Sequence, residues 1–206
     1  MNVSSLAPVS LAMVVALSGC SDPQAASNEN FGKAINAFYQ ANPACLLVTR
    51  KELPLKIDRN GYAGDIRAMK QLDALAKVGL LTSSDTQETV GTGLFKANRS
   101  YRTYALSEQG QKSYATWGKG NKGFCYGQLE VVTVNNFTEP SPLLGMTVSQ
   151  VSYTFRVKDT AAWSQDAAVK AAYERAVVPP GETVQGKAIV VKTGNGWVHE
   201  GMLDKS

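Results

Sequence analysis

Residues 151–158 alternate between apolar and polar side chains, and this run restricts the fold more than any other part of the chain. Val151, Tyr153, Phe155 and Val157 occupy every second position. Successive side chains of a strand point to opposite faces, so this spacing predicts a strand with one buried face. The chain must therefore build a sheet that has a core on one side.

Further signals of the same kind lie on both sides of this run. The order of strands and helix is β-β-α-β-β, which predicts an antiparallel sheet with one packed helix. An Asn-Gly pair favours a tight hairpin, because both residues accept positive φ angles. The fold class we expect is α+β, with strands at 127–137, 151–158 and 188–191, a helix from Thr160 to about Arg175 and a hairpin turn at 194–197.

The closing segment, residues 190–198, is similar to the last hairpin of cystatin-like and NTF2-like modules. That resemblance implies a binding module.

Charge divides the chain into two parts. Residues 50–123 hold thirteen Lys and Arg against seven Asp and Glu, whereas residues 124–206 hold seven against eight. A glycine-rich stretch, residues 117–123, separates the two parts and predicts a boundary. We expect a signal peptide (1–19), a tether (20–29), a first domain (30–118), a linker (119–126) and an α+β domain (127–206).

The first domain begins with helical spacing. Phe31, Ala34, Ile35 and Phe38 follow Asn28 and Asn30, either of which can cap a helix, and Pro43 ends the pattern. Another helix is predicted from about Asp65 to Val78, with Gly79 as its stop. Strands at 46–48, 80–82 and 101–106 and a helix opening at Ser107 complete the expected domain.

Two segments of this domain, 72–81 and 101–112, resemble the third helix and hairpin wing of a winged-helix domain. They contain a helix, a Gly-Leu-Leu turn, a variable wing and a Tyr-x-Leu-Ser-x-x-Gly joint. The resemblance spans residues 65–116. It implies a winged-helix-like unit, in which the third helix and the wing form the contact surface.

Basic residues lie where such a unit would make contacts. On a helical wheel, Arg67, Lys70, Ala74 and Lys77 face away from the apolar stripe, and the wing adds Lys96, Arg99 and Arg102. Clustered cations of this kind can bind phosphate groups. One alternative is an ordinary solvated helix face in which Asp73 is interleaved. The interpretation we favour is a winged-helix scaffold that holds a protein, glycan or lipid surface.

The string Leu17-Ser18-Gly19-Cys20 closes an apolar run of seven residues, 11–17. A membrane-spanning helix needs roughly 20 apolar residues, so the run is too short to span. The string resembles a bacterial lipobox, which implies cleavage before Cys20 and attachment of diacylglycerol and a fatty acid such as palmitate. By the same resemblance, Ser21 directs the protein to the outer membrane, facing the periplasm.

Removing Cys20 from the count leaves Cys45 and Cys125. In an oxidising periplasm an even pair predicts one disulfide. It would close a loop of about 80 residues and stabilise the fold by about 4 kcal/mol in the chain-entropy model. Two unrelated buried thiols are the alternative.

Catalytic groups are sparse. The chain has one histidine, His199, which predicts a surface residue on a terminal strand and no histidine metal site. The string Gly91-Thr92-Gly93 lacks the Gly-Lys-Ser/Thr ending of a P-loop. We therefore expect no metal, no cofactor and no catalytic residues.

The sequence thus favours a noncatalytic lipoprotein of the cell envelope, attached to the membrane by lipid, that binds a protein or a cell-wall glycan. Two alternatives stay open: a periplasmic enzyme or enzyme inhibitor acting on envelope polymers, and an anchored DNA-binding regulator. Export argues against a nucleic-acid partner, since a periplasmic protein does not meet the chromosome.

Overall fold

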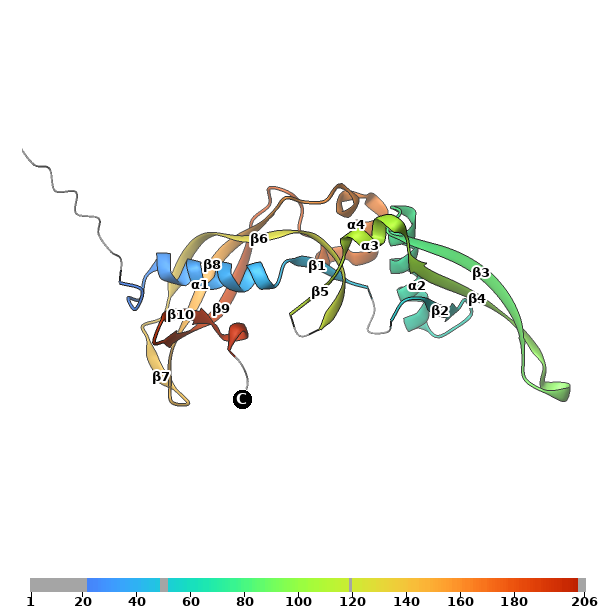
Figure 1. Cartoon of the computed structure of the whole chain (residues 1–206), viewed down its shortest axis with the longest axis horizontal. Coiled ribbons are helices and arrows are strands. Elements are labelled where there is room, and N and C mark those ends of the chain that lie inside the picture. Colours follow the sequence, from blue (N-terminus) through green and yellow to red (C-terminus); the bar gives the residue numbers. More distant parts are fainter. Residues whose placement is uncertain (1–21, 49–51, 119, 204–206) are drawn as a thin grey trace, which may run out of the picture.

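The protein has a mixed α+β fold in which every strand pair of the described residues is antiparallel. The computed structural model describes residues 22–48, 52–118 and 120–203. The molecule is elongated (Figure 1). One end is built around helix α1 (Asn28–Ala41) and the other around helix α2 (Ala63–Lys77). We name these ends the α1 lobe and the α2 lobe.

The α1 lobe is a helix packed on one face of an antiparallel sheet. The sheet has seven strands, ordered β1-β6-β8-β9-β10, with β5 added to β6 and β7 added to β8. The lobe comprises α1 (Asn28–Ala41), β6 (Asn121–Phe137), β7 (Ser141–Leu143), β8 (Met146–Lys158), β9 (Val184–Thr193), β10 (Gly196–His199) and the 3-10 turn η4 (Glu200–Met202).

The α2 lobe contains a helix and a separate sheet of three strands, ordered β2-β4-β3. A long hairpin, β3–β4, projects from this lobe to one end of the molecule (Figure 1). Its elements are β2 (Leu55–Asp58), α2 (Ala63–Lys77), β3 (Leu81–Val90), the 3-10 turn η1 (Gly93–Phe95), β4 (Ala97–Leu106) and α3 (Glu108–Ser113).

Short elements lie between the two lobes. They are β1 (Ala44–Leu47), β5 (Tyr114–Trp117), η2 (Ala162–Gln165), α4 (Ala167–Tyr173) and η3 (Glu174–Ala176).

Helix α1 forms where the apolar spacing predicted it, although its cap differs from the expectation. Ser27, rather than Asn28 or Asn30, is the N-cap, and its hydroxyl accepts a hydrogen bond from the Asn30 backbone N–H at 3.2 Å. The Asn30 side chain donates instead to two carbonyls upstream of the helix.

Aromatic side chains build the core of the α1 lobe. The fully buried Phe31 ring meets Phe137 and Trp197 edge-on, with ring centroids 4.8 and 4.9 Å apart. Such edge-to-face pairs add to the stabilisation that burial provides. Val151 and Tyr153 are buried against α1, which confirms the core face predicted from the alternation.

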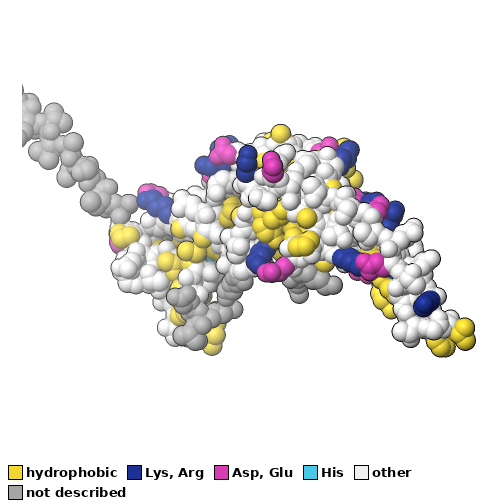
Figure 2. Space-filling view, turned by 45° about the vertical axis from the view of Figure 1, so that its right-hand side comes forward, with side chains coloured by type: hydrophobic (Ala, Val, Ile, Leu, Met, Phe, Trp, Pro, Cys, Tyr) yellow, Lys and Arg dark blue, Asp and Glu magenta, His cyan; other side chains and the backbone are white. Residues whose placement is uncertain are grey.

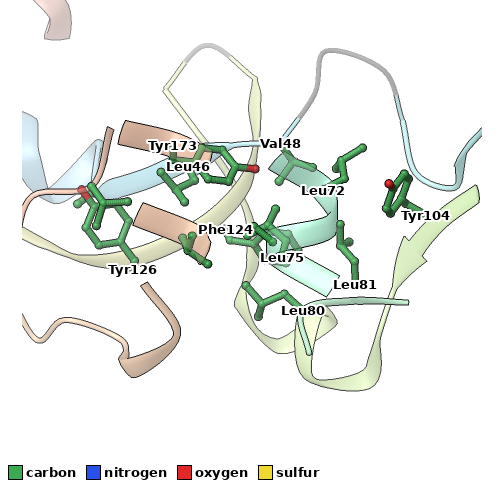
Figure 3. Close-up of a cluster of buried hydrophobic side chains, with 14 of the residues drawn as sticks. Leu46, Val48, Leu72, Leu75, Leu80, Leu81, Tyr104, Phe124, Tyr126 and Tyr173 are labelled. Carbon is green, nitrogen blue, oxygen red and sulfur yellow. The ribbon is translucent and has the colours of Figure 1, made fainter. Parts of the chain in front are cut away.

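The core of the α2 lobe is largely aliphatic (Figure 3). Leu72 and Leu75 of α2 are buried against Leu80, Leu81 and aromatic residues of β4 and β6. Gly79 adopts a positive φ of 79° and ends the helix, as the sequence predicted.

Strand β6 passes through both cores, so the domain division differs from the expected one. Residues 121–126 of the predicted linker form its first part, where Phe124 and Tyr126 are buried in the α2-lobe core. Its later residue Val134 lies in the α1-lobe core. Helix α1, expected in the first domain, packs on the sheet of the second one, because its apolar face matches the inner face of β6 and β8.

The predicted packed helix also lies elsewhere. The segment from Thr160 forms two 3-10 turns around the short α4, and α4 lies against α2 rather than covering the sheet. Ala-rich α4 is narrow enough for that close approach. The helix on the sheet is α1.

Most of the expected tether is folded onto the α1 lobe. Gln24 donates from Nε2 to the carbonyls of Thr193 and Gly194, at 2.9 Å each, and its own carbonyl accepts from Trp197 Nε1 at 3.3 Å. These bonds fix the chain from Asp22 onward. From Asp22 onward, the segment expected as a tether is therefore part of the folded lobe.

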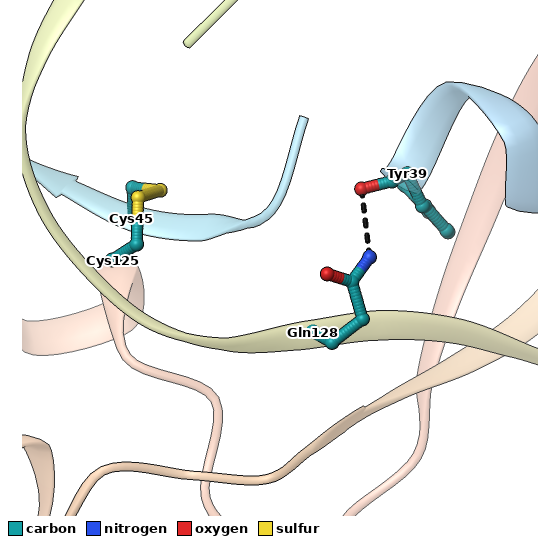
Figure 4. Close-up of a disulfide and its surroundings, with 4 residues drawn as sticks. All are labelled: Tyr39, Cys45, Cys125 and Gln128. Atoms are coloured by element: carbon teal, nitrogen blue, oxygen red, sulfur yellow. Dashed lines mark hydrogen bonds between the residues drawn. A yellow bond between two sulfur atoms is a disulfide. The ribbon is translucent and has the colours of Figure 1, made fainter. Parts of the chain in front are cut away.

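Cys45 and Cys125 face each other across β1 and β6 (Figure 4). Their sulfur atoms lie 1.99 Å apart, at disulfide distance. The loop between them, with a sequence separation of 80, holds all the elements of the α2 lobe. Nearby, Gln128 Nε2 donates to the Tyr39 carbonyl at 2.9 Å and ties β6 to the end of α1.

Candidate functional site: a groove along helix α2

A groove runs along α2 and brings together three of the six predicted basic residues. Lys70 and Lys77 of α2 and Arg102 of β4 line a cavity of about 630 Å³. Arg67 lines an adjoining depression of about 440 Å³, which shares Lys70 with the groove. Lys96 and Arg99 lie farther out on the β3–β4 hairpin and do not reach the groove.

The floor of the groove is apolar and its rim is charged. The floor comes from α2 and α4, and the rim adds one basic residue that the sequence analysis did not select, Arg59. The lining residues are Ile66, Met69, Ala74, Ala168 and Ala171 on the floor and Arg59, Lys70, Asp73, Lys77 and Arg102 on the rim. This combination suits a side chain with an apolar body and a polar end.

Helix α4 forms one wall, which changes the predicted contact face of α2. Ala74 was expected on the solvated side together with Arg67 and Lys70, but it is buried. Gln71 Nε2 donates to the Ala172 carbonyl at 3.4 Å, and Lys77 Nζ lies 3.8 Å from the Asp166 carboxylate at the start of α4. The exposed strip of α2 is therefore narrower than the sequence suggested.

Arg102 is the electrostatic centre of the rim. Its Nε and Nη2 donate to the two Asp85 oxygens at 2.7 and 2.8 Å, and its Nη1 donates to Asp73 at 3.0 Å. The hydrogen bond from Arg102 lowers the pKa of Asp85, and both carboxylates raise the pKa of Arg102. Bidentate pairing of this kind fixes geometry as well as charge.

Two other basic residues are also paired with carboxylates. Arg99 Nη1 donates to Asp58 at 2.6 Å and lowers the pKa of that carboxyl, while Arg59 Nη1 lies 3.1 Å from Asp85. Within the part of the chain that the structure describes, Arg67, Lys70 and Lys96 have no carboxylate within ion-pair distance. The surface is a mixed network rather than the uniform basic patch that a polyanion would require.

Two tyrosines lie below the groove. Tyr104 donates its hydroxyl to Asp73 at 2.7 Å, and burial together with that bond raises the pKa of Tyr104. Tyr173 lines the adjoining depression. Its buried hydroxyl points toward Val48 (Figure 3) and has no hydrogen-bond partner among the described residues, and burial raises its pKa.

The single histidine lies far from this groove. His199 ends β10, where its ring stacks on Phe38 at a centroid distance of 3.9 Å. Its Nδ1 accepts a hydrogen bond from the Gly201 backbone N–H at 2.9 Å, and partial burial lowers the pKa of His199. It therefore has a structural role at the end of the sheet.

Several expectations concern features beyond this groove. Cys20 and the predicted signal peptide lie outside the described residues. Across residues 22–48, 52–118 and 120–203, no three His, Cys, Asp or Glu side chains gather closely enough to hold a metal ion. The helices of those ranges are all too short or too polar to cross a membrane.

Comparison with known proteins gives no relative: the chain matches no protein-family model, no curated protein and no solved structure.

Sequence reasoning missed the apolar half of the groove. Ile66 and Met69 belong to the same helix as the predicted cations, but Ala168 and Ala171 come from a helix that was expected to cover the sheet. The available signal was the run of alanines at helical spacing in α4, because small side chains permit another helix to approach closely. That signal does not show which helix packs against α4.

Proposed function

We propose that this protein is a noncatalytic binding protein of the bacterial cell envelope, and that the groove along α2 holds a segment of a partner protein. The observation that carries the proposal is the apolar floor between α2 and α4, bordered by charged side chains. Ile66 of this floor is 54% exposed and lines the groove together with other apolar side chains, so it belongs to an exposed apolar patch of the kind that marks interaction sites.

The groove favours a protein segment over a polymer of uniform charge. Arg102, Arg59 and Lys77 already have carboxylate partners, so a polyanion would have to displace them. Lys70 has no such partner among the described residues and can pair with an acidic group. The partner segment we propose carries an apolar side chain for the floor and a neighbouring carboxylate for Lys70.

The scaffold of the groove is, in this proposal, a winged-helix-like unit. What supports it is the order of elements: β2 pairs with β4, α2 leads into β3, and the β3–β4 hairpin follows as a wing. With α4 against α2 and the wing arginines paired, the unit serves as a scaffold for protein binding rather than for reading DNA.

Attachment to the membrane is the remaining part of the proposal. The lipobox-like string predicts lipid on Cys20, in the outer membrane and facing the periplasm. Because the chain is fixed to the β9–β10 turn from Asp22 onward, the lipid would hold the α1 lobe close to the bilayer. The α2 lobe, at the other end of the molecule, would present the groove to a partner.

A photo-crosslinking amino acid placed in cells at Arg67, in the depression that adjoins the groove, tests the groove and leaves Lys70 in place. The matched control is the same amino acid at Lys187, an exposed lysine of β9 in the α1 lobe. We expect a defined protein adduct from position 67 and none of the same mass from position 187. Adducts of equal yield from both positions, or none from position 67, would refute the groove as the binding site.

A further inference from the structure

Two hairpin tips expose large apolar side chains. At the tip of β3–β4, Leu94 and Phe95 are 101% and 88% exposed. At the tip of β7–β8, Leu144 is 90% exposed and stands between the half-exposed Leu143 and Met146. Soluble surfaces seldom place such side chains at the ends of projections, where they protect nothing from water.

The segments that carry the two tips contain no acidic residue. No acidic residue occurs from Thr89 to Ser107, and Lys96 directly follows the exposed pair. From Pro140 to Phe155 the chain carries no charged side chain at all. One tip is therefore apolar with an adjacent cation, and the other is apolar and neutral.

Both tips lie on the same side of the molecule, although they belong to opposite lobes. In Figure 1 the β3–β4 hairpin and the β7–β8 hairpin both end at the lower edge, one at each end. Figure 2, turned about the vertical axis, again shows hydrophobic side chains at the two lower extremities. Between the two tips the molecule forms an arch.

We propose that the two tips insert together into the interface of one lipid bilayer with anionic headgroups. The apolar layer of a bilayer is flat and continuous, so it can bury the apolar side chains of two separate tips at once. A protein partner would need a complementary pocket for each tip. Lys96 can pair with a lipid phosphate beside the inserted Leu94 and Phe95. The inference shares the envelope location with the proposed function but uses neither the groove nor its partner.

The test uses the full chain bound to vesicles of phosphatidylethanolamine and phosphatidylglycerol. A photo-crosslinking amino acid replaces Phe95 or Leu144, and the control position is Val132, which is 46% exposed on β6. Val132 belongs to neither hairpin tip and lies beside α1, so it is an exposed apolar position outside the proposed contact. We expect lipid adducts from positions 95 and 144 at several times the yield from position 132.

Further variants separate this proposal from the groove. Ile66→Asp leaves the lipid adducts unchanged, because the groove takes no part in membrane contact. Leu144→Ser lowers the lipid adducts from position 95 several-fold, because one tip then has to bind alone. Lys96→Glu lowers them further in the anionic vesicles.

Adduct yields from positions 95 and 144 no higher than from position 132 would overturn the proposal. Crosslinking of either tip to a second copy of the chain, with no lipid adduct, would overturn it as well.

Discussion

The two lobes of this protein hold themselves together by different means. The α1 lobe packs aromatic rings between a helix and a sheet, and the buried hydroxyls of Tyr39 and Tyr153 share a hydrogen bond of 2.7 Å. The α2 lobe packs mainly aliphatic side chains, with aromatic rings from β4 and β6 among them, and carries ion pairs centred on Arg102 at its surface. The lobe with paired charges around an apolar floor is the one that offers a binding groove.

The largest expected effect comes from the disulfide between Cys45 and Cys125, which closes the loop that contains the α2 lobe. Replacing Cys45 and Cys125 by alanine should reduce the free energy of unfolding by about 4 kcal/mol, because the disulfide restricts a loop of 80 residues in the unfolded chain. Urea unfolding measures the loss. Hydrogen exchange should show α2 losing more protection than α1.

Equal loss of protection in both lobes would contradict that division. Two free thiols titrated in the denatured, unreduced wild-type protein would show that no bond forms.

The aromatic core of the α1 lobe gives the next effect. Phe31→Leu keeps an apolar side chain but removes both edge-to-face contacts, and we expect a loss of about 2 kcal/mol. Because no charges are involved, the loss should be the same at low and high salt. Phe38→Leu, in a half-buried position of the same helix, is the control and should cost less. A strong dependence of the Phe31→Leu effect on salt would contradict an aromatic origin.

The buried hydroxyl pair gives a smaller effect. Tyr39→Phe leaves the Tyr153 hydroxyl buried without its partner, at a cost of roughly 1–2 kcal/mol. Removing both hydroxyls should cost less than the sum of the two single changes, since no orphaned group remains. Thermal unfolding of the two single variants and the double variant completes the cycle. Additive losses would mean that the two hydroxyls do not interact.

The smallest effects are changes in the free energy of unfolding with pH, and the pH range of the change differs between the two lobes. Burial lowers the pKa of His199, so its stabilising contribution is present above the ordinary histidine pKa of 6.5 and is lost as the pH falls toward the lower folded value. Arg102 lowers the pKa of Asp85, so that contribution is present above the ordinary value of 3.8 and is lost only at more acidic pH.

Urea unfolding across pH should therefore show His199→Gln flattening the profile just below pH 6.5 and Asp85→Asn flattening it below pH 3.8. Profiles for both variants that run parallel to the wild type would contradict these assignments.

The sequence predicted the elements better than their partners. Period-two alternation at Val151–Lys158 and helical spacing after Asn28 depend on neighbours along the chain, and both elements form where expected. Which helix packs on which sheet or helix depends on contacts between segments that are far apart in the sequence. The sequence could not show that α1 would cover the distant sheet, or that α4 would lie on α2.

The candidate site shows the same limit. Lys70 and Lys77 were predictable from the helical wheel, because their spacing is local. The burial of Ala74 and the pairing of Arg102 with Asp85 were not, because each depends on a segment brought in by the fold. The ion pairs then change the chemistry of the surface from cationic to mixed.

The central claim is that the partner protein binds the α2 lobe and not the α1 lobe, and one matched pair of variants tests it most directly. Ile66→Asp puts a charge on the groove floor, and Val132→Asp puts one at a similarly exposed apolar position of the α1 lobe, 46% against 54% exposed. The yield of the protein adduct from a crosslinker at position 67 is measured in both, with thermal unfolding to verify folding. We predict that Ile66→Asp lowers the yield about tenfold, because the carboxylate removes the apolar contact and can pair with Lys70 one turn along α2, and that Val132→Asp leaves it unchanged. Equal yields in the two variants would contradict the account.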